Sequence, residues 1–328
     1  MFQSRIVSIG IFAFSGCILQ KLIKIDYACL QIGINSRSVE PMNKISETAY
    51  LVAMYRAIES ERPDALFQDP FARLLAGGQG QLLVAILGDQ KQATNIIATR
   101  TYVIDRMIEQ LVRSHKIDTV VNLGAGLDTR PYRLSLPRSL HWIEVDLPDI
   151  LIYKENKLQD QQPVCSLQRV QLDLSNLGLR KSLFAEINAT ATKVLVLTEG
   201  LLSYLPEEQV GLLAEDLKEQ PNFRWWLFEL VSAFGLQQFR LLWREKIFNQ
   251  YFSENNTSVF LFAPEYGLDF FHHCGWRTSE FHSIWKESRR LKRGVRFAAF
   301  LELLMRWFAK QYWRALNRSI GIALLERL

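Results

Sequence analysis

Two glycines, Gly124 and Gly126, follow a short apolar segment and are the first residues of this sequence whose spacing could do chemistry. A glycine at a strand end lets a ligand approach the backbone, because no Cβ stands in the way. A dinucleotide site has a third glycine three residues later, where this chain has Thr129, and the lysine of a phosphate-binding P-loop is absent. Two glycines also fit a plain tight turn, in which Asp128 and Arg130 are expected to pair locally.

Acidic residues follow the next three strand-like segments of the chain. Glu144 and Asp146 lie about 20 residues beyond the glycines, where a carboxylate can accept hydrogen bonds from ribose hydroxyls. Asp173, with Leu174 beside it, follows the third segment and could take the amine of an adenine, and Glu199 follows the fourth. One acid at one strand end is common. Acids after three strands, with glycines after the first, indicate an adenosyl ligand that has no pyrophosphate.

Alternating strand-like and helical segments predict the sheet that must position these residues. Apolar runs predict strands at 119–123, 141–145, 168–172, 194–198 and 225–230. Apolar residues at three- and four-residue spacing, together with proline and capping signals, predict helices from residue 45 onward, at 71–75, at 93–114 and at 206–218. Such alternation is typical of a parallel sheet with helices on both faces, and its ligands bind at the carboxyl ends of the strands.

Several motifs, in order along the chain, resemble the leucine carboxyl methyltransferase family and its bacterial O-methyltransferase relatives. The strongest are GAGLDTRPYRL (124–134), WIEVDLP (142–148) with Lys154 a few residues on, and TEGLLSYLP (198–206). The others are TAYLVAMYRAIES (48–60), DPFA (69–72), RTYVID (100–105) and CGW (274–276), so the resemblance spans 45–277. It implies an α/β, Rossmann-like class I methyltransferase fold, with a mostly parallel, seven-stranded, doubly wound sheet and added N- and C-terminal helices.

The resemblance also implies that S-adenosyl-L-methionine is the cofactor and gives each binding residue a role. Arg100 would bind the carboxylate of its methionine part, since a guanidinium pairs well with a carboxylate, and Glu199 would hold the amino group. The other implied contacts are Asp146 with the ribose, Asp173 and Leu174 with the adenine, and Gly124, Ala125 and Gly126 along the cofactor.

One departure from the family pattern concerns the acceptor. Eukaryotic carboxyl methyltransferases have a lysine directly before the arginine of the motif at 48–60, whereas Tyr55 precedes Arg56 here. We therefore expect O-methylation of a small-molecule carboxylate or hydroxyl. Methylation of a protein carboxylate or of RNA is the alternative, and a non-catalytic, membrane-associated scaffold that binds S-adenosylmethionine is the alternative from another class.

Methyl transfer from a sulfonium depends mainly on the alignment of the acceptor, the methyl carbon and the sulfur. A carboxylate acceptor needs no base, whereas a hydroxyl benefits from one. Tyr204 is predicted to face the acceptor and His273 to act as a base, with a packed ring and a solvated imidazole as the alternatives. His272 and His273 are adjacent and would point in different directions, and no second ligand pair accompanies them, so no metal is expected.

Composition sets the class of protein and its expected location. The 328 residues are 48% hydrophobic and 22% charged, which excludes disordered and fibrous classes. Four scattered cysteines without a CxxC pair indicate reduced thiols and a cytoplasmic protein. Residues 1–41 are expected to be a poorly ordered N-terminal extension, although 6–19 has the length of a signal-peptide core. The methyltransferase domain is predicted to cover 42–296.

The C-terminal segment is strongly basic. From Lys286 to the end, eleven Lys and Arg residues stand against three Glu. A basic amphipathic helix is predicted over 297–328, with a stripe at four-residue spacing made by Arg306, Lys310, Arg314 and Arg318. Such a helix can pack on its own domain, lie on an anionic membrane surface or follow phosphates. Packing is expected, peripheral membrane contact is the alternative, and nucleic acid is not expected as a partner.

Overall fold

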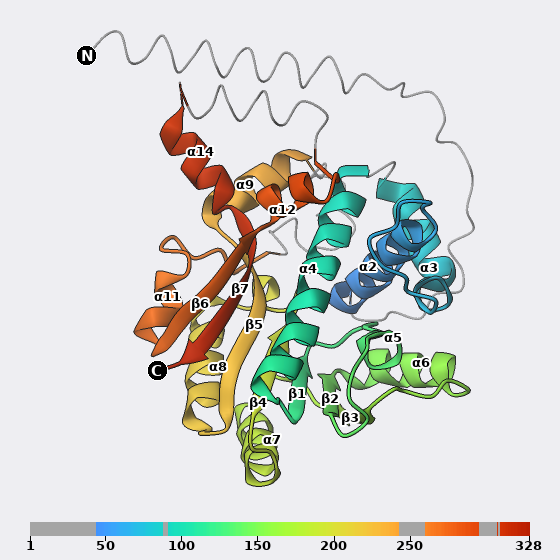
Figure 1. The fold of residues 1–328 in the computed structure, drawn as a ribbon, viewed down its shortest axis with the longest axis vertical. Helices are drawn as coiled ribbons and strands as arrows, with labels where there is room; N and C mark the ends of the chain where they lie inside the picture. The colour runs from blue at the N-terminus through green and yellow to red at the C-terminus, as the bar shows by residue number, and fades with distance from the viewer. Residues whose placement is uncertain (1–43, 88–90, 243–259, 295–306, 308) are drawn as a thin grey trace. The chain divides into compact units, whose positions relative to one another are not determined.

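The computed structural model describes residues 44–87, 91–242, 260–294, 307 and 309–328 (Figure 1). Its strands are β1 (Thr119–Leu123), β2 (His141–Asp146), β3 (Ser166–Gln171), β4 (Val194–Thr198), β5 (Phe223–Val231), β6 (Trp276–Ser283) and β7 (Ile320–Arg327). They form one seven-stranded sheet in the order β3-β2-β1-β4-β5-β7-β6. Strands β1 to β5 run parallel, and β7 runs antiparallel to both β5 and β6. The predicted mostly parallel, seven-stranded sheet is confirmed.

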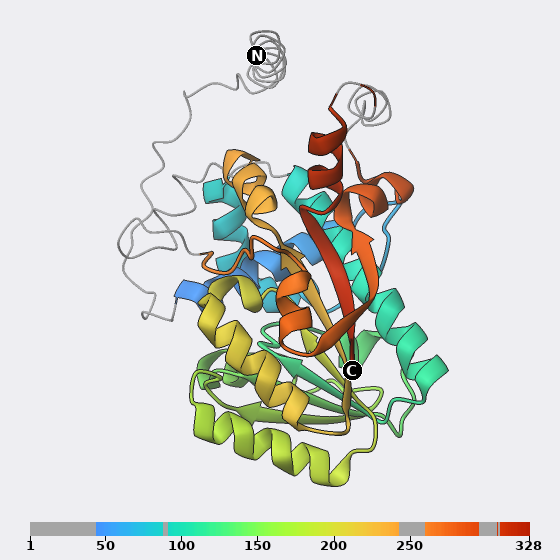
Figure 2. The same ribbon diagram turned by 90° about the vertical axis from the view of Figure 1, so that its left-hand side faces the viewer.

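Helices cover both faces of this sheet. They are α2 (Lys44–Ser60), α3 (Ala72–Leu87), α4 (Lys91–His115), α5 (Arg130–Arg133), α6 (Pro148–Leu158), α7 (Leu177–Thr190), α8 (Glu207–Glu219), α9 (Ala233–Leu242), α11 (Asp269–His273), α12 (Ile284–Arg290) and α14 (Lys310–Asn317), with a 3-10 turn η1 (Leu202–Tyr204). Helices α7 and α8 lie on one face and α4 lies on the other (Figures 1 and 2). Helices α2 and α3 pack against each other in a third cluster, which also includes residues of α6.

The strands are apolar because both faces of the sheet are covered. On β1, Val121 packs with the cluster that contains α7 and α8, whereas its neighbour Val120 packs with the cluster that contains α4. Every residue of β1 and of β4 is buried. A parallel strand in such a sheet has no polar face, and the sequence therefore shows an unbroken apolar run. The five predicted strands coincide with β1 to β5 to within two residues at each end.

The C-terminal segment corrects one prediction. A helix over 297–328 is wrong for Ile320–Arg327, because these residues form β7 between β5 and β6. Ile322 packs on the α4 side of the sheet and Ala323 on the α8 side, so this strand too is an apolar run that its periodicity alone does not distinguish from a buried helix. Residues 297–306 of the predicted helix lie outside the described part of the chain.

The domain predicted to end at residue 296 therefore includes β7. Residues 42–328 group into one compact unit. Of the basic stripe, Lys310, Arg314 and Arg318 are exposed on α14 and directly after it, whereas Arg306 is not among the described residues. Each helix that the structure describes is too short or too polar to span a bilayer. Contact of this basic surface with a membrane stays a prediction.

The position of β7 predicts how much the C-terminal strand contributes to stability. Leu324 is 1% exposed in the sheet, whereas Leu328, four residues later, is 72% exposed. We expect Leu324→Ala to lower the free energy of unfolding by about 2–5 kcal/mol, because it leaves a cavity between β7 and α4. Leu328→Ala is the matched control and should change it by about 0.5 kcal/mol or less. Urea unfolding followed by circular dichroism measures both, and equal effects would contradict the placement of β7.

Candidate functional site

The glycines after β1 form a tight elbow at the carboxyl edge of the sheet. Gly124 and Gly126 have φ angles of 69° and 46°, in the left-handed region that favours glycine. The N–H groups of Gly124 and Ala125 both donate to one carbonyl at the end of β2, at 2.9 and 3.2 Å. A Cβ on Gly124 would lie 3.1 Å from Leu201 Cδ1, and one on Gly126 would lie 3.3 Å from Ala49 Cβ. Both the backbone conformation and the space therefore call for glycine.

Asp146, the last residue of β2, lies directly against this elbow. Its Oδ2 atom accepts a hydrogen bond from the Gly126 N–H at 2.6 Å, and its Oδ1 atom accepts one from the Leu147 N–H at 2.7 Å. Burial raises the pKa of the Asp146 carboxyl, and these two N–H groups offset only part of the effect. Ribose hydroxyls would supply further donors to the ionised carboxylate, as the predicted role requires.

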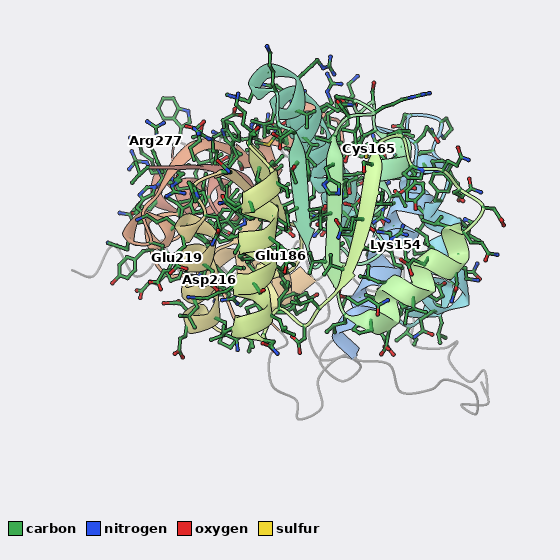
Figure 3. All side chains as sticks on the ribbon, turned by 90° about the horizontal axis from the view of Figure 1, so that it is seen from below. Lys154, Cys165, Glu186, Asp216, Glu219 and Arg277 are labelled. Atoms are coloured by element: carbon green, nitrogen blue, oxygen red, sulfur yellow. The ribbon has the colours of Figure 1, made fainter. Side chains whose placement is uncertain are left out.

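Glu144, which the sequence offered as a second ribose ligand, has a different role. Its carboxylate is fully buried and pairs with Lys154 Nζ at 2.6 Å and with Arg169 Nε at 2.9 Å. Lys154 reaches the sheet from α6 (Figure 3). A buried carboxylate that is held by two cations joins β2, β3 and α6, and it is not placed to bind a ligand.

The predicted adenine residues follow β3, the neighbour of β2. Asp173 is exposed, and its Oδ1 atom accepts a hydrogen bond from the Ser175 N–H at 2.9 Å. Leu174 is half-buried and packs against the core. Gln171 pairs with Asp146 in the register of the two strands, so Asp173 lies only two residues beyond the level of the ribose candidate. The structure thus places these two residues at the edge where the elbow lies.

Buried ion pairs connect the remaining charged motif residues. Nitrogen–oxygen distances between successive members are 2.6 to 3.8 Å, and no side chain is more than 14% exposed. The pairs join α2, α4 and α5 to the ends of β4 and β5. We call the nine residues the ion-pair chain, which runs in the order Arg56, Asp69, Arg133, Asp105, Arg130, Glu199, Arg100 and Glu229, with Asp128 joined to Arg130.

Three carboxylates of the ion-pair chain, Asp69, Asp128 and Glu199, are held in the charged form. Burial opposes ionisation of Glu199, but Arg130 and Arg100 outweigh it and lower the pKa of this carboxyl. Asp69 and Asp128 behave likewise: nearby cations outweigh the effect of burial and lower the pKa of both carboxyls. The local pairing of Asp128 with Arg130, at 2.9 Å, is confirmed, and it forms only one link of a longer chain.

Arg100 links Glu199 to Glu229 at the end of the ion-pair chain that lies beside β4 and β5. Its Nη1 atom donates to Glu229 Oε2 at 2.6 Å. Its Nε atom lies 2.8 Å from Glu199 Oε1, but not at an angle that makes a hydrogen bond, so it is a buried donor without a hydrogen-bond partner among the described residues. Such a group can donate a hydrogen bond to a ligand oxygen. Arg100 therefore fits the carboxylate that the resemblance assigns to it.

Tyr204 lies in the 3-10 turn η1, shortly after Glu199, and its ring stacks on Phe260 with centroids 5.5 Å apart. Its hydroxyl donates to Thr48 Oγ1 at 3.3 Å. Burial raises the pKa of the Tyr204 hydroxyl, on which the charges of Arg100 and Glu229 also act. The phenol is therefore protonated at neutral pH. Tyr204 is thus a neutral aromatic group at the same edge as Arg100.

His273, which the sequence offered as a base, lies away from the glycine elbow and the ion-pair chain. It is exposed on α11, just before β6. The first residue of β6, Trp276, pairs with Arg327. The adjacent Glu326 pairs with Trp225, near the beginning of β5. His273 therefore lies near the amino ends of the parallel strands, opposite the edge that carries the glycine elbow.

Two surface cavities, of about 460 and 480 Å³, lie elsewhere. One lies along α4, and the other is lined by residues of α5, α6 and β3. Neither is lined by a residue of the glycine elbow or of the ion-pair chain. Among the described residues, no three His, Cys, Asp or Glu side chains are grouped so that they could hold a metal ion.

Comparison with known proteins identifies the family. A sequence profile described as leucine carboxyl methyltransferase matches residues 49–218, about half of the chain. The chain belongs to the leucine carboxyl methyltransferase family. The match includes the elbow, Asp146 and every member of the ion-pair chain except Glu229.

Relatives of this member of the leucine carboxyl methyltransferase family agree on the cofactor. A protein of Mycobacteroides abscessus is 32% identical over 231 residues, which are 66% of this chain and 72% of that protein. A protein of Streptomyces coelicolor is 36% identical over 183 residues, which are 53% of this chain and 64% of that protein. The names of both place them among S-adenosyl-L-methionine-dependent methyltransferases. The chain is accordingly a methyltransferase that uses S-adenosyl-L-methionine.

A solved structure supports the fold of this leucine carboxyl methyltransferase family member. A DUF574 family protein from Streptomyces avermitilis superposes with a TM-score of 0.54, covering 86% of this chain and 97% of that protein. The two sequences are only 15% identical. The similarity therefore bears on the fold alone.

The ion-pair chain predicts how stability depends on pH. Since the pKa of the Asp69 carboxyl is lower in the folded than in the unfolded protein, its ionisation stabilises the fold above its ordinary pKa of about 3.9, and this contribution is lost as the pH falls through the folded value. Asp69→Asn leaves Arg56 without its carboxylate and should cost about 3–5 kcal/mol at pH 7.

Thermal unfolding of both proteins between pH 7 and pH 3 measures this effect. The difference between wild type and Asp69→Asn should shrink as the pH falls. Asp160→Asn, on an exposed position, is the control and should follow the wild type at every pH. A difference that is independent of pH would contradict the charged state of the ion-pair chain.

Proposed function

We propose that this protein O-methylates a small molecule, with S-adenosyl-L-methionine as the methyl donor. The observation that supports the proposal is the meeting, at one sheet edge, of the glycine elbow, the Asp146 carboxylate and Arg100, which has a spare buried donor. When bound, the cofactor supplies a methyl group that its sulfonium already activates. The protein then has to hold the cofactor and the acceptor in line.

In the proposed function the chain's own residues bind and orient. Arg100 on α4 holds a carboxylate and Asp146 on β2 holds vicinal hydroxyls, so the methionine and ribose parts of the cofactor are held by different elements of the fold. The ion-pair chain keeps Arg100 in place through Glu199 and Arg130. Alignment of this kind can contribute about 7–11 kcal/mol to lowering a barrier.

Two features favour a small acceptor. Tyr55, at the position of the family's lysine, is 1% exposed in the core that α2 and α3 share, so this position supplies no cation for a peptide carboxylate. Tyr204 and Phe260 form a stacked aromatic pair shortly after the end of β4, which favours an aromatic acceptor. The second candidate is methylation of a protein carboxylate, which the description of the matched family favours.

Cofactor binding is tested by the stability it adds. S-adenosylhomocysteine at about 100 times its dissociation constant should add about 2.7 kcal/mol to the free energy of unfolding, whereas NAD should add nothing. We expect Asp146→Asn to remove most of this gain, because the amide accepts ribose hydrogen bonds poorly. Asp149→Asn, three residues later and exposed, is the control. Stabilisation by NAD, or full stabilisation of Asp146→Asn, would contradict the proposed site.

The size of the acceptor is tested by following a labelled methyl group. The protein is incubated with methyl-labelled S-adenosylmethionine and a cell extract, which is then separated by ultrafiltration. We expect the label in the small-molecule filtrate. In the retained proteins we expect no label above the background given by Asp146→Asn. Label that stays with the retained proteins and is released by mild base, as a methyl ester is, would favour the second candidate. Absence of any label would favour a binding scaffold.

A further inference from the structure

Glu229 is a buried carboxylate that the motifs of the chain do not include. It lies on β5, whose parallel neighbour β4 ends just before Glu199. Thr198 pairs with Phe228 in the register of these strands, so the two glutamates occupy neighbouring positions at the same sheet edge. Like charges on adjacent strands repel each other, and their proximity needs a cation between them.

Arg100 is that cation. It lies 2.6 Å from Glu229 and 2.8 Å from Glu199, and the two glutamate side chains are 11% and 14% exposed. Glu199 has a second cationic partner, because Arg130 Nη1 donates to it at 2.7 Å. Among the described residues, Arg100 is the cation that pairs with Glu229. The two carboxylates therefore differ: Glu199 is held from two sides, and Glu229 from one.

Cofactor binding would change the surroundings of Glu229 in particular. A methionine carboxylate that pairs with Arg100 competes with Glu229 for the same guanidinium. Glu199 keeps Arg130 in that state, whereas Glu229 loses part of its pairing with Arg100. Glu229 is then a carboxylate that can accept a hydrogen bond from another molecule at this edge.

The surroundings of Glu229 indicate what that molecule is. The charge of Glu229 acts on the Tyr204 hydroxyl and contributes to its raised pKa. The Tyr204 ring forms a stacked aromatic pair with Phe260. Arg100, Glu199 and Glu229, together with the ammonium, sulfonium and carboxylate of the cofactor, carry equal numbers of positive and negative charges. An acceptor that is itself a carboxylate would add an uncompensated charge to a buried site, which is costly. An uncharged aromatic hydroxyl adds none.

We propose that Glu229 binds the acceptor, that the acceptor is a neutral phenol, and that the Glu229 carboxylate takes its proton. The step balances as one displacement: the phenol oxygen forms a bond to the methyl carbon, and the carbon–sulfur bond breaks with its electron pair left on sulfur. The O–H proton passes to Glu229 and then to water. This inference rests on the proposed function and narrows its acceptor from carboxylates and hydroxyls to phenols.

The first measurement separates this role from cofactor binding. S-adenosylhomocysteine is titrated into wild type, Glu229→Gln and Glu199→Gln by calorimetry. We expect Glu229→Gln to bind it as tightly as wild type or more tightly, because glutamine competes less for Arg100. Glu199→Gln should weaken binding by about tenfold or more. Equal weakening in both variants would overturn the inference, since Glu229 would then belong to the cofactor site. A wild type that does not bind would instead overturn the proposed function.

The second measurement uses matched acceptors that share one ring, such as 2-naphthol with 2-naphthoate and 4-nitrophenol with 4-nitrobenzoate, and follows S-adenosylhomocysteine formation. We expect turnover of phenols only, and a kcat that is lower by about 10²–10⁴ in Glu229→Gln. Turnover of the carboxylates in preference, no turnover of any phenol, or an unchanged kcat in the variant would overturn the inference.

Two further variants complete the design. Glu326→Gln removes another Glu–Arg pair, 2.8 Å from Arg277 on β6, and is the matched control that should keep wild-type kcat and affinity. In Figure 3, Arg277 on the edge strand β6 and Lys154 on helix α6 lie on opposite sides of the view. Glu229→Asp keeps the charge should Glu229→Gln fail to fold. Its carboxylate is one methylene shorter, so kcat should fall by about tenfold or more while affinity holds; an unchanged kcat would overturn the inference.

Discussion

The ion-pair chain between Arg56 and Glu229 is the constraint on which the rest of the structure depends. A buried charge is tolerated only when its partners are in place, and each partner here comes from another element of the fold. Asp69, in the connection from α2 to α3, accepts from Arg56 on α2 and from Thr129 beside the elbow. The motifs that lie far apart in the sequence are therefore partners of one another, and each can be buried only when the others are.

The same chain bears on where we propose that the ligand binds. Along most of its length the charged groups satisfy each other, as Arg130 does with Asp105, Asp128 and Glu199. At the carboxyl ends of β4 and β5 this satisfaction is incomplete, because the Arg100 Nε atom has no hydrogen bond among the described residues. A buried network with one spare donor, at Arg100, is preorganised for a ligand there. The glycine elbow, which lets a ligand approach the backbone of β1, lies at the same edge.

Local pattern predicted much of this architecture, and its failures have a common cause. Strands β1 to β5 were predictable because a strand covered on both faces is apolar throughout. The C-terminal strand β7 has the same kind of sequence, but apolar residues at Ile322 and Leu324 fit a helix as well as a covered strand. His273 has the right chemistry for a base, yet residue type carries no information on which edge of a sheet a loop reaches. Glu229 had no motif around it, since its partner Arg100 is 129 positions away.

The sequence by itself determined which residues are candidates for the cofactor: the two glycines after β1, Asp146 at the end of β2, and Glu199 after β4. These residues are readable because each follows its own strand directly, and parallel strands bring their carboxyl ends to one edge. Only the tertiary structure decided which cations each carboxylate pairs with. Glu144 is held by Lys154 and Arg169, whereas Glu229 shares Arg100 with Glu199. Pairing depends on side chains that meet through space, across strand register and helix packing, and this proximity is not a function of spacing along the chain.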